Sequence, residues 1–116
     1  MNKKILLASL TTLMAGLSSL AVFASDAEHG KSIYNATCAV CHGIDGTGEM
    51  PGVSDLTKEG GGLHQDDRIL LSRMLNGYQD PGSGMVMPPR GGNPALTESD
   101  LKDVLQYMRR EFQVSR

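Results

Sequence analysis

Two cysteines three positions apart, followed directly by a histidine, constrain this chain more than any other feature of its sequence. Cys38 and Cys41 are the only cysteines among the 116 residues, and His42 follows at once. This spacing places two thiols on one tight turn, where both can add to the vinyl groups along one edge of a porphyrin. The adjacent imidazole would then lie beneath the iron as a neutral nitrogen ligand. The motif therefore predicts one covalently attached haem c, bound through Cys38 and Cys41, with His42 as an axial ligand.

Three other interpretations of the same residues are weaker. A disulfide between Cys38 and Cys41 would close a very short loop, whereas the stability that a disulfide gives grows with loop length. A thioredoxin-type redox pair needs a βαβ context, which the surrounding sequence does not show. A zinc site needs four protein ligands, and no second cysteine or histidine pair occurs at metal-binding spacing.

Residues 1–24 have the pattern of a signal peptide. Two lysines near the start precede a mostly apolar run over 5–20, and Val22-Phe23-Ala24 matches the small residues before a cleavage site. Cleavage would leave a single domain over residues 25–116, exported to the bacterial periplasm, where haem attachment is completed. The alternative is an uncleaved membrane anchor, since the run is nearly long enough to span a bilayer. Small and hydroxyl residues dilute the run, which favours removal and no stable membrane insertion.

The charge of the chain bears on its partners. Eleven basic and thirteen acidic side chains give a net charge of −2, and loss of residues 1–24 with their two lysines makes it about −4. Such a domain is unsuited to nucleic acid. We expect instead a monomer whose redox partner proteins carry a basic docking surface. The association should slow as the salt concentration rises.

The rest of the sequence predicts short helices. Residues 26–37 and 66–76 have helical patterns with acidic residues in the first turn. Thr97 and Asp100 match a capping box at the start of a last helix. The apolar stripe of that last helix consists of Leu101, Val104, Leu105, Met108 and Phe112.

Between the helices lie two long loops rich in glycine and proline, over 42–62 and 78–94, and no strand pattern occurs. Glycines allow the backbone to approach a flat ligand, and Val53 and Leu56 can face the porphyrin. The chain has two Phe, three Tyr and no Trp, which indicates a small hydrophobic core. A core of this size needs additional stabilisation, which a covalently bound haem supplies. The expected fold class is a small all-α domain of three to four short helices around one haem.

The group that binds iron opposite His42 decides the function of such a site. Met87 is the best candidate, because Pro88 and Pro89 stiffen the backbone directly after it. Met85 is the alternative, and both methionines could instead be ordinary lining of the pocket. The other candidate donors, which we rank lower, are Met50, Met74, Met108, His29 and His64.

Taken together, these motifs resemble the class I c-type cytochromes. The resemblance rests on Gly30 and Tyr34 before the cysteine motif, and on Met87-Pro88-Pro89 before a capped last helix. Residues 87–97 are most similar to the short bacterial members of the c-five kind. Some of those relatives carry two further cysteines near residues 92–96, which this chain lacks.

The resemblance implies a monohaem cytochrome c fold and several contacts within it. Gly30 and Tyr34 would mark the place where the first helix crosses the last, with Tyr107 as the aromatic residue across the crossing. The carbonyl of Pro51 would accept the hydrogen bond of the His42 ring.

Two functions of different classes follow. The first is a periplasmic one-electron carrier between larger redox proteins, with iron held by His42 and Met87, and a variant of it is a carrier docked permanently on one enzyme. The second is a haem sensor or catalytic subunit with an open sixth position, which needs a polar donor above the iron that residues 85–89 do not offer. Because no acid/base or nucleophile constellation occurs outside the haem site, we expect an electron-transfer protein and not an enzyme.

Overall fold

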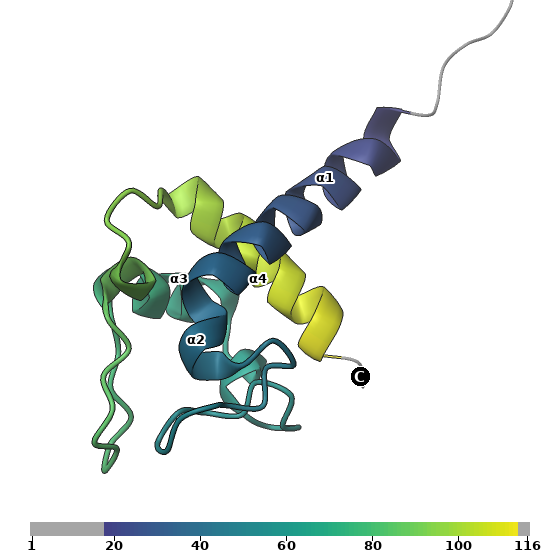
Figure 1. Cartoon of the computed structure of the whole chain (residues 1–116). Helices are drawn as coiled ribbons and strands as arrows, with labels where there is room; N and C mark the ends of the chain where they lie inside the picture. Colours follow the sequence, from purple (N-terminus) through teal and green to yellow (C-terminus); the bar gives the residue numbers. More distant parts are fainter. Residues whose placement is uncertain (1–17, 114–116) are drawn as a thin grey trace, which may run out of the picture.

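The structure is a computed structural model that describes residues 18–113, with side chains from residue 26 onward. The helices and loops form one body, from which the start of the first helix projects (Figure 1). The predicted signal peptide, residues 1–24, lies mostly outside the described residues, so its removal stays a prediction. The elements in chain order are α1 (Ser18–Ile33), the π-helical segment η1 (Tyr34–Cys38), α2 (Ala39–His42), the 3-10 turn η2 (Gly62–His64), α3 (Asp67–Asn76), the 3-10 turn η3 (Pro89–Gly92) and α4 (Glu98–Phe112).

The all-α fold class is confirmed. Residues 18–113 contain no strand, and their one isolated antiparallel bridge pairs Tyr78 with Met87. None of the helices in this part of the chain has both the length and the apolar character to span a bilayer. The predicted helix over 66–76 is present as α3, with Asp66 in the extended conformation just before it.

The last helix begins where its sequence predicts. The Thr97 hydroxyl accepts a hydrogen bond from the amide of Asp100 at 3.1 Å, and the Asp100 carboxylate accepts one from the amide of Thr97 at 2.9 Å. This reciprocal pair is the predicted capping box, which satisfies two amides that the helix leaves free. The predicted apolar stripe is buried, together with Tyr107.

The first helical stretch is longer than predicted. The sequence indicated a helix over 26–37, but α1 begins at Ser18 and the helical path continues through η1 and α2 to His42. No proline interrupts residues 26–42, and the path ends at Gly43, whose φ of 82° suits glycine. Within this path η1 is a wider π-helical turn that ends at Cys38, the first residue of the cysteine motif. The two thiols and the imidazole therefore lie at the end of one continuous helical rod.

This rod crosses α4 in backbone contact at Gly30. A Cβ atom added to Gly30 would overlap the carbonyl group of Asp103 and lie 2.8 Å from the amide nitrogen of Val104. Two helices can approach this closely only where one of them has no side chain. The predicted role of Gly30 at the crossing is confirmed.

An aromatic cluster fills the same crossing. The ring centroids of Tyr34 and Tyr107 lie 5.4 Å apart, which confirms the predicted pair. Phe112 completes the cluster, with centroid distances of 5.4 Å to Tyr34 and 5.8 Å to Tyr107. Tilted ring pairs at such distances stabilise a core beyond the area they bury.

A polar contact joins the two helices on the exposed side of the crossing. Nδ1 of His29 lies 2.8 Å from a carboxylate oxygen of Asp103, and Nε2 lies 4.0 Å from Asp100. The hydrogen bond to Asp103 is the main cause that raises the pKa of His29, although the ring is exposed. The charged form of His29 therefore stabilises the folded state.

Replacing Gly30 with Ala should lower the free energy of unfolding by about 3 kcal/mol, because the added methyl group separates two packed backbones. Denaturant unfolding of the haem-bound protein measures the change. Gly84→Ala is the matched control, since a Cβ there meets no atom within 4 Å and Gly84 does not have a positive φ. Equal stability of the two variants would contradict the proposed backbone contact.

The stabilisation from His29 should depend on pH. Its pKa is raised in the folded state, so the contribution is complete below the unfolded pKa of about 6.5 and disappears as pH rises through the folded pKa. The difference in unfolding free energy between the wild-type protein and His29→Gln should be larger near pH 5.5 than near pH 8.5. A difference that does not change with pH would show that the contact with Asp103 does not form.

Candidate functional site

A cavity of about 490 Å³ lies beside the cysteine motif. Its size falls within the range of about 300–1,000 Å³ typical of pockets for cofactors. The lining comes from the motif, from the loop before α3, from α3 itself, from the segment before η3 and from α4. The cavity brings together most of the residues that the sequence singled out, namely Cys38, Cys41, His42, Val53, Leu56, Met74, Met85, Met87 and Met108.

The two cysteines lie at the mouth of this cavity as free thiols, not joined to each other. Cys38 ends η1 and Cys41 lies within α2. Burial raises the pKa of the Cys38 thiol to about 11, and the nearby Cys41 adds to the shift. The raised pKa keeps this thiol neutral at pH 7, and a neutral sulfur suits an apolar site. A thioether formed with a vinyl group is also neutral, so the site can hold it equally well.

The His42 ring lines the same cavity. Burial lowers the pKa of its imidazole, an effect that the backbone of Ser54 partly offsets. A lowered pKa keeps the ring neutral at pH 7, which is the form that binds iron. Nδ1 is buried and has no hydrogen bond of good geometry, even though Ser54 lies close enough to affect the pKa.

Ser54 is a residue that the sequence analysis missed. Pro51, which the resemblance pointed to, is exposed and does not line the cavity. Its carbonyl as the acceptor for His42 stays a prediction, and the structure favours the backbone of Ser54, three residues further along. No sequence signal distinguishes the two, because a loop without helical or strand periodicity does not define which backbone group faces the ring.

The loop after the motif folds back over the end of the helical rod. The carbonyl of His42 accepts a hydrogen bond from the amide of Gly48 at 2.8 Å, and the carbonyl of Cys41 accepts one from Glu49 at 2.8 Å. The hydroxyl of Tyr34 donates to the carbonyl of Gly43 at 2.7 Å. These bonds satisfy carbonyls that a helix end leaves without partners. They hold the imidazole and both thiols in one orientation.

Both candidate methionines line the cavity, on the segment before η3. Met87 pairs with Tyr78 through two backbone hydrogen bonds of 3.0 and 2.8 Å, and Pro88 and Pro89 follow it. The amide of Met85 donates to the Ser83 hydroxyl at 3.1 Å. No sequence pattern predicted the bridge to Tyr78.

The weaker candidate donors divide into two groups. Met74 and Met108 line the cavity, and Met108 is buried in the core as expected. Met50 is 41% exposed and does not line the cavity. His29 is bound to Asp103, and His64 is exposed and lines a separate cavity of about 530 Å³. That second cavity contains no thiol and no thioether, so the chemistry of interest lies in the first.

Comparisons with known proteins agree with this geometry. The model of the family described as cytochrome c matches residues 27–110. Cytochrome c-555 of Chlorobaculum tepidum is 38% identical over 88 residues, which cover 74% of this chain and 77% of that protein. The chain belongs to the cytochrome c family.

Further relatives agree with this assignment. Cytochrome c-555 of Prosthecochloris aestuarii is 36% identical over 87 residues, which cover 72% of this chain and 85% of that protein. Cytochrome c6 of Porphyra purpurea is 31% identical over 91 residues, covering 74% and 72%. No solved structure matches the chain significantly.

The predicted identity as a monohaem class I c-type cytochrome is confirmed, and so is the cofactor. This cytochrome binds one haem c covalently through Cys38 and Cys41. As a member of the family, it is an electron-transfer protein and not an enzyme. Among the described residues no group of three His, Cys, Asp or Glu side chains could hold a metal ion.

One basic side chain of the cytochrome also fits a haem, and the sequence analysis missed it. Arg73, on α3, lines the cavity with its guanidinium 3.8 Å from the centre of the Tyr78 ring. No carboxylate of residues 26–113 forms an ion pair with it. A haem carries two carboxylates, which a guanidinium binds well. Arg73 lies three residues after the buried Leu70 and therefore on the same helical face. This spacing was the sequence signal that could have placed Arg73 at the cavity.

Replacing Tyr34 with Phe should lower the free energy of unfolding by about 1 kcal/mol, because the hydrogen bond to the buried Gly43 carbonyl is lost and that carbonyl keeps only the bond from the Gly46 amide. Denaturant unfolding of the haem-bound cytochrome measures the change. Tyr107→Phe is the control, since it removes a hydroxyl from the same cluster without removing a hydrogen bond that the structure describes there, and should change stability by less than about 0.5 kcal/mol. Equal losses in the two variants would contradict a stabilising role for the bond to Gly43.

Proposed function

We propose that this electron-carrying cytochrome works in the periplasm, moving one electron at a time between larger redox proteins, with His42 and Met87 as the two axial ligands. The observation that carries the proposal is the lining of the cavity, which combines a neutral imidazole with methionine thioethers. When bound, the haem supplies the one-electron chemistry. An axial methionine raises the reduction potential relative to ligation by two histidines.

The structure supports Met87 over Met85 through the backbone. Met87 is held by two hydrogen bonds to Tyr78 and by the prolines after it, so it has few alternative positions. Met85 is held through the side chain of Ser83, whose hydroxyl also donates to the carbonyl of Gly52 at 3.1 Å. A ligand that stays bound in both oxidation states needs little reorganisation, and the more rigid position suits that requirement.

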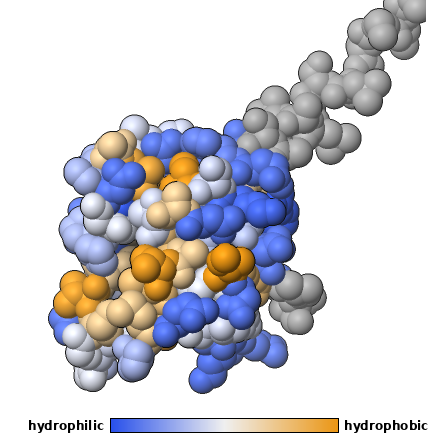
Figure 2. Space-filling view, in the orientation of Figure 1, coloured by the Kyte–Doolittle hydropathy of each residue, from blue (hydrophilic) through white to orange (hydrophobic). Residues whose placement is uncertain are grey.

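Residues near the cavity also suit a redox partner. Val40 and Val86 line the cavity and are 73% and 57% exposed. Figure 2 shows separate apolar patches on the face in view, within a largely hydrophilic surface. The loop over 43–61 carries Asp45, Glu49, Asp55 and Glu59 but only one basic residue, Lys58. An apolar contact bordered by acidic side chains suits a partner with a basic surface and a weak, small interface.

Periplasmic location is supported by the sequence of residues 1–24 and by the chemistry of the cofactor. Attachment of haem to two thiols requires reduced cysteines to be presented in an otherwise oxidising compartment. A cytochrome of this kind that carries an export signal therefore acts outside the cytoplasm, as a monomer between larger redox proteins.

Replacing Met87 with Ala should open the sixth position of the iron. We expect a lower reduction potential, loss of the absorption band of methionine-ligated ferric haem, and rapid binding of carbon monoxide to the ferrous form. Visible spectra and redox titration of the haem-bound protein measure these changes, with Met85→Ala as the matched control that should keep all three properties.

The reverse result, in which Met85→Ala opens the site and Met87→Ala does not, would move the ligand to Met85. Rapid binding of carbon monoxide by the wild-type protein would instead reject a closed site. It would favour the second candidate function, a sensor or catalytic subunit with an exchangeable ligand.

A further inference from the structure

One wall of the haem cavity is nearly bare of side chains. Gly60, Gly61, Gly62, Leu63 and Gln65 all line the cavity. A Cβ added to Gly60 or Gly62 would meet no atom within 4 Å, so neighbouring groups do not confine these two positions. Three consecutive glycines have the greatest conformational freedom of any tripeptide. The order of this wall therefore depends on what holds the segment at its ends.

Within itself the segment makes only local backbone bonds. The amides of Gly61, His64 and Gln65 each donate to a carbonyl three residues earlier. Among the hydrogen bonds of the described residues, those that join 60–65 to a distant part of the fold come from Arg109 and Gln113, on and just after α4. The buried side chain of Leu63 is the apolar anchor of the same segment.

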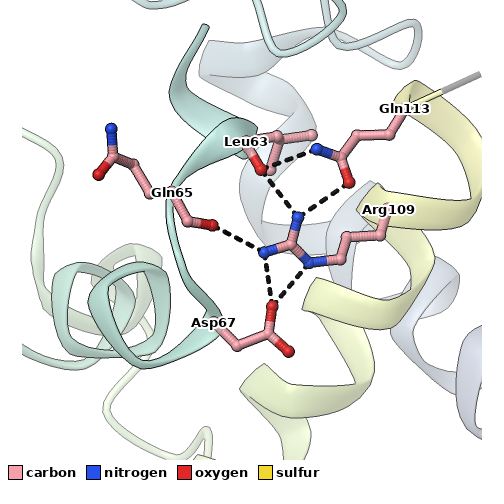
Figure 3. Close-up of polar contacts among 5 residues, drawn as sticks. All are labelled: Leu63, Gln65, Asp67, Arg109 and Gln113. Atoms are coloured by element: carbon pink, nitrogen blue, oxygen red, sulfur yellow. Dashed lines mark hydrogen bonds and ion pairs between the residues drawn. The ribbon is translucent and has the colours of Figure 1, made fainter. Parts of the chain in front are cut away.

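Arg109 contacts four residues at this wall and beside it (Figure 3). Its Nη1 donates to the carbonyl of Leu63 at 2.8 Å and its Nη2 to the carbonyl of Gln65 at 2.9 Å. Its Nε donates to the carboxylate of Asp67, at the start of α3, at 2.7 Å. Nη1 also donates to the side-chain oxygen of Gln113 at 2.8 Å. The side-chain amide of Gln113 in turn donates to the same Leu63 carbonyl. A planar guanidinium can bind all these acceptors at once, and an ammonium group cannot.

We propose that Arg109 is a positioning residue that holds the 60–65 wall against the haem and thereby keeps the reduction potential high. The inference rests on the proposed function, in which a haem occupies this cavity. A loosened glycine wall admits water to the face of the cofactor. Water stabilises the more highly charged ferric form, so the potential falls when the wall opens.

Arg109→Lys tests the proposal, because it keeps the positive charge and removes the planar fork. The matched control is Arg110→Lys, the same change one residue later, at a side chain that pairs with Glu28 on α1 and with Glu111 beside it. In the haem-bound protein, hydrogen exchange of amides 60–65 should rise at least about tenfold in Arg109→Lys and remain unchanged in Arg110→Lys. The reduction potential should fall in Arg109→Lys alone, while the spectrum keeps the signature of the wild-type axial ligands.

Two results would overturn the proposal. One is unchanged exchange over 60–65 in Arg109→Lys. The other is a potential that stays at the wild-type value, or falls equally in Arg110→Lys, although the wall has loosened. If Arg109→Lys does not accumulate as haem-bound protein, Asp67→Asn removes the carboxylate partner instead, and the same two readouts decide. Failure of the proposed function is seen separately, as rapid binding of carbon monoxide by the wild-type cytochrome.

Discussion

The backbone contact at Gly30 is the constraint on which the rest of the structure depends. It sets the distance and angle between α4 and the helical rod that ends in the cysteine motif. The aromatic cluster of Tyr34, Tyr107 and Phe112 occupies the space beside this contact. Because the thiols and His42 lie at the end of the same rod, the crossing also determines where the haem is attached relative to α4. The crossing at Gly30 thus determines both the packing of the aromatic cluster and the position of the cofactor.

The two long loops are ordered by bonds that connect them to helix ends. The loop after the motif caps the carbonyls of Cys41 and His42, and the segment carrying Met87 pairs with Tyr78 just after α3. Each loop thereby holds one of the two side chains that we propose as iron ligands, His42 and Met87. The glycines that make these loops irregular also let them pass close to a flat cofactor, as at Gly77, where a Cβ would lie 2.8 Å from the Met87 carbonyl.

The glycine wall over 60–65 is a face of the cavity that is held mainly from the end of α4, by Arg109 and Gln113. The wall has no side chains at three successive positions, and its distant hydrogen bonds come from the end of α4. A helix that forms half of the core crossing thus also holds the cover of the cavity. Stability of the crossing and the environment of the cofactor are therefore coupled through α4.

The sequence by itself determined the features that depend on near neighbours in the chain: the thiol and imidazole spacing at Cys38–His42, the capping box at Thr97, and the apolar stripe of the last helix. Gly30 was also recognisable, because a glycine within a helical pattern requires a reason. Only the tertiary structure decided that the backbone of Ser54 lies close to the His42 ring, that Arg73 lines the cavity, and that Arg109 binds the glycine wall. These contacts join loops without periodicity to residues as much as 46 positions away. Spacing along the chain predicts which residues share a helical face, but it does not determine which distant backbone group a side chain meets.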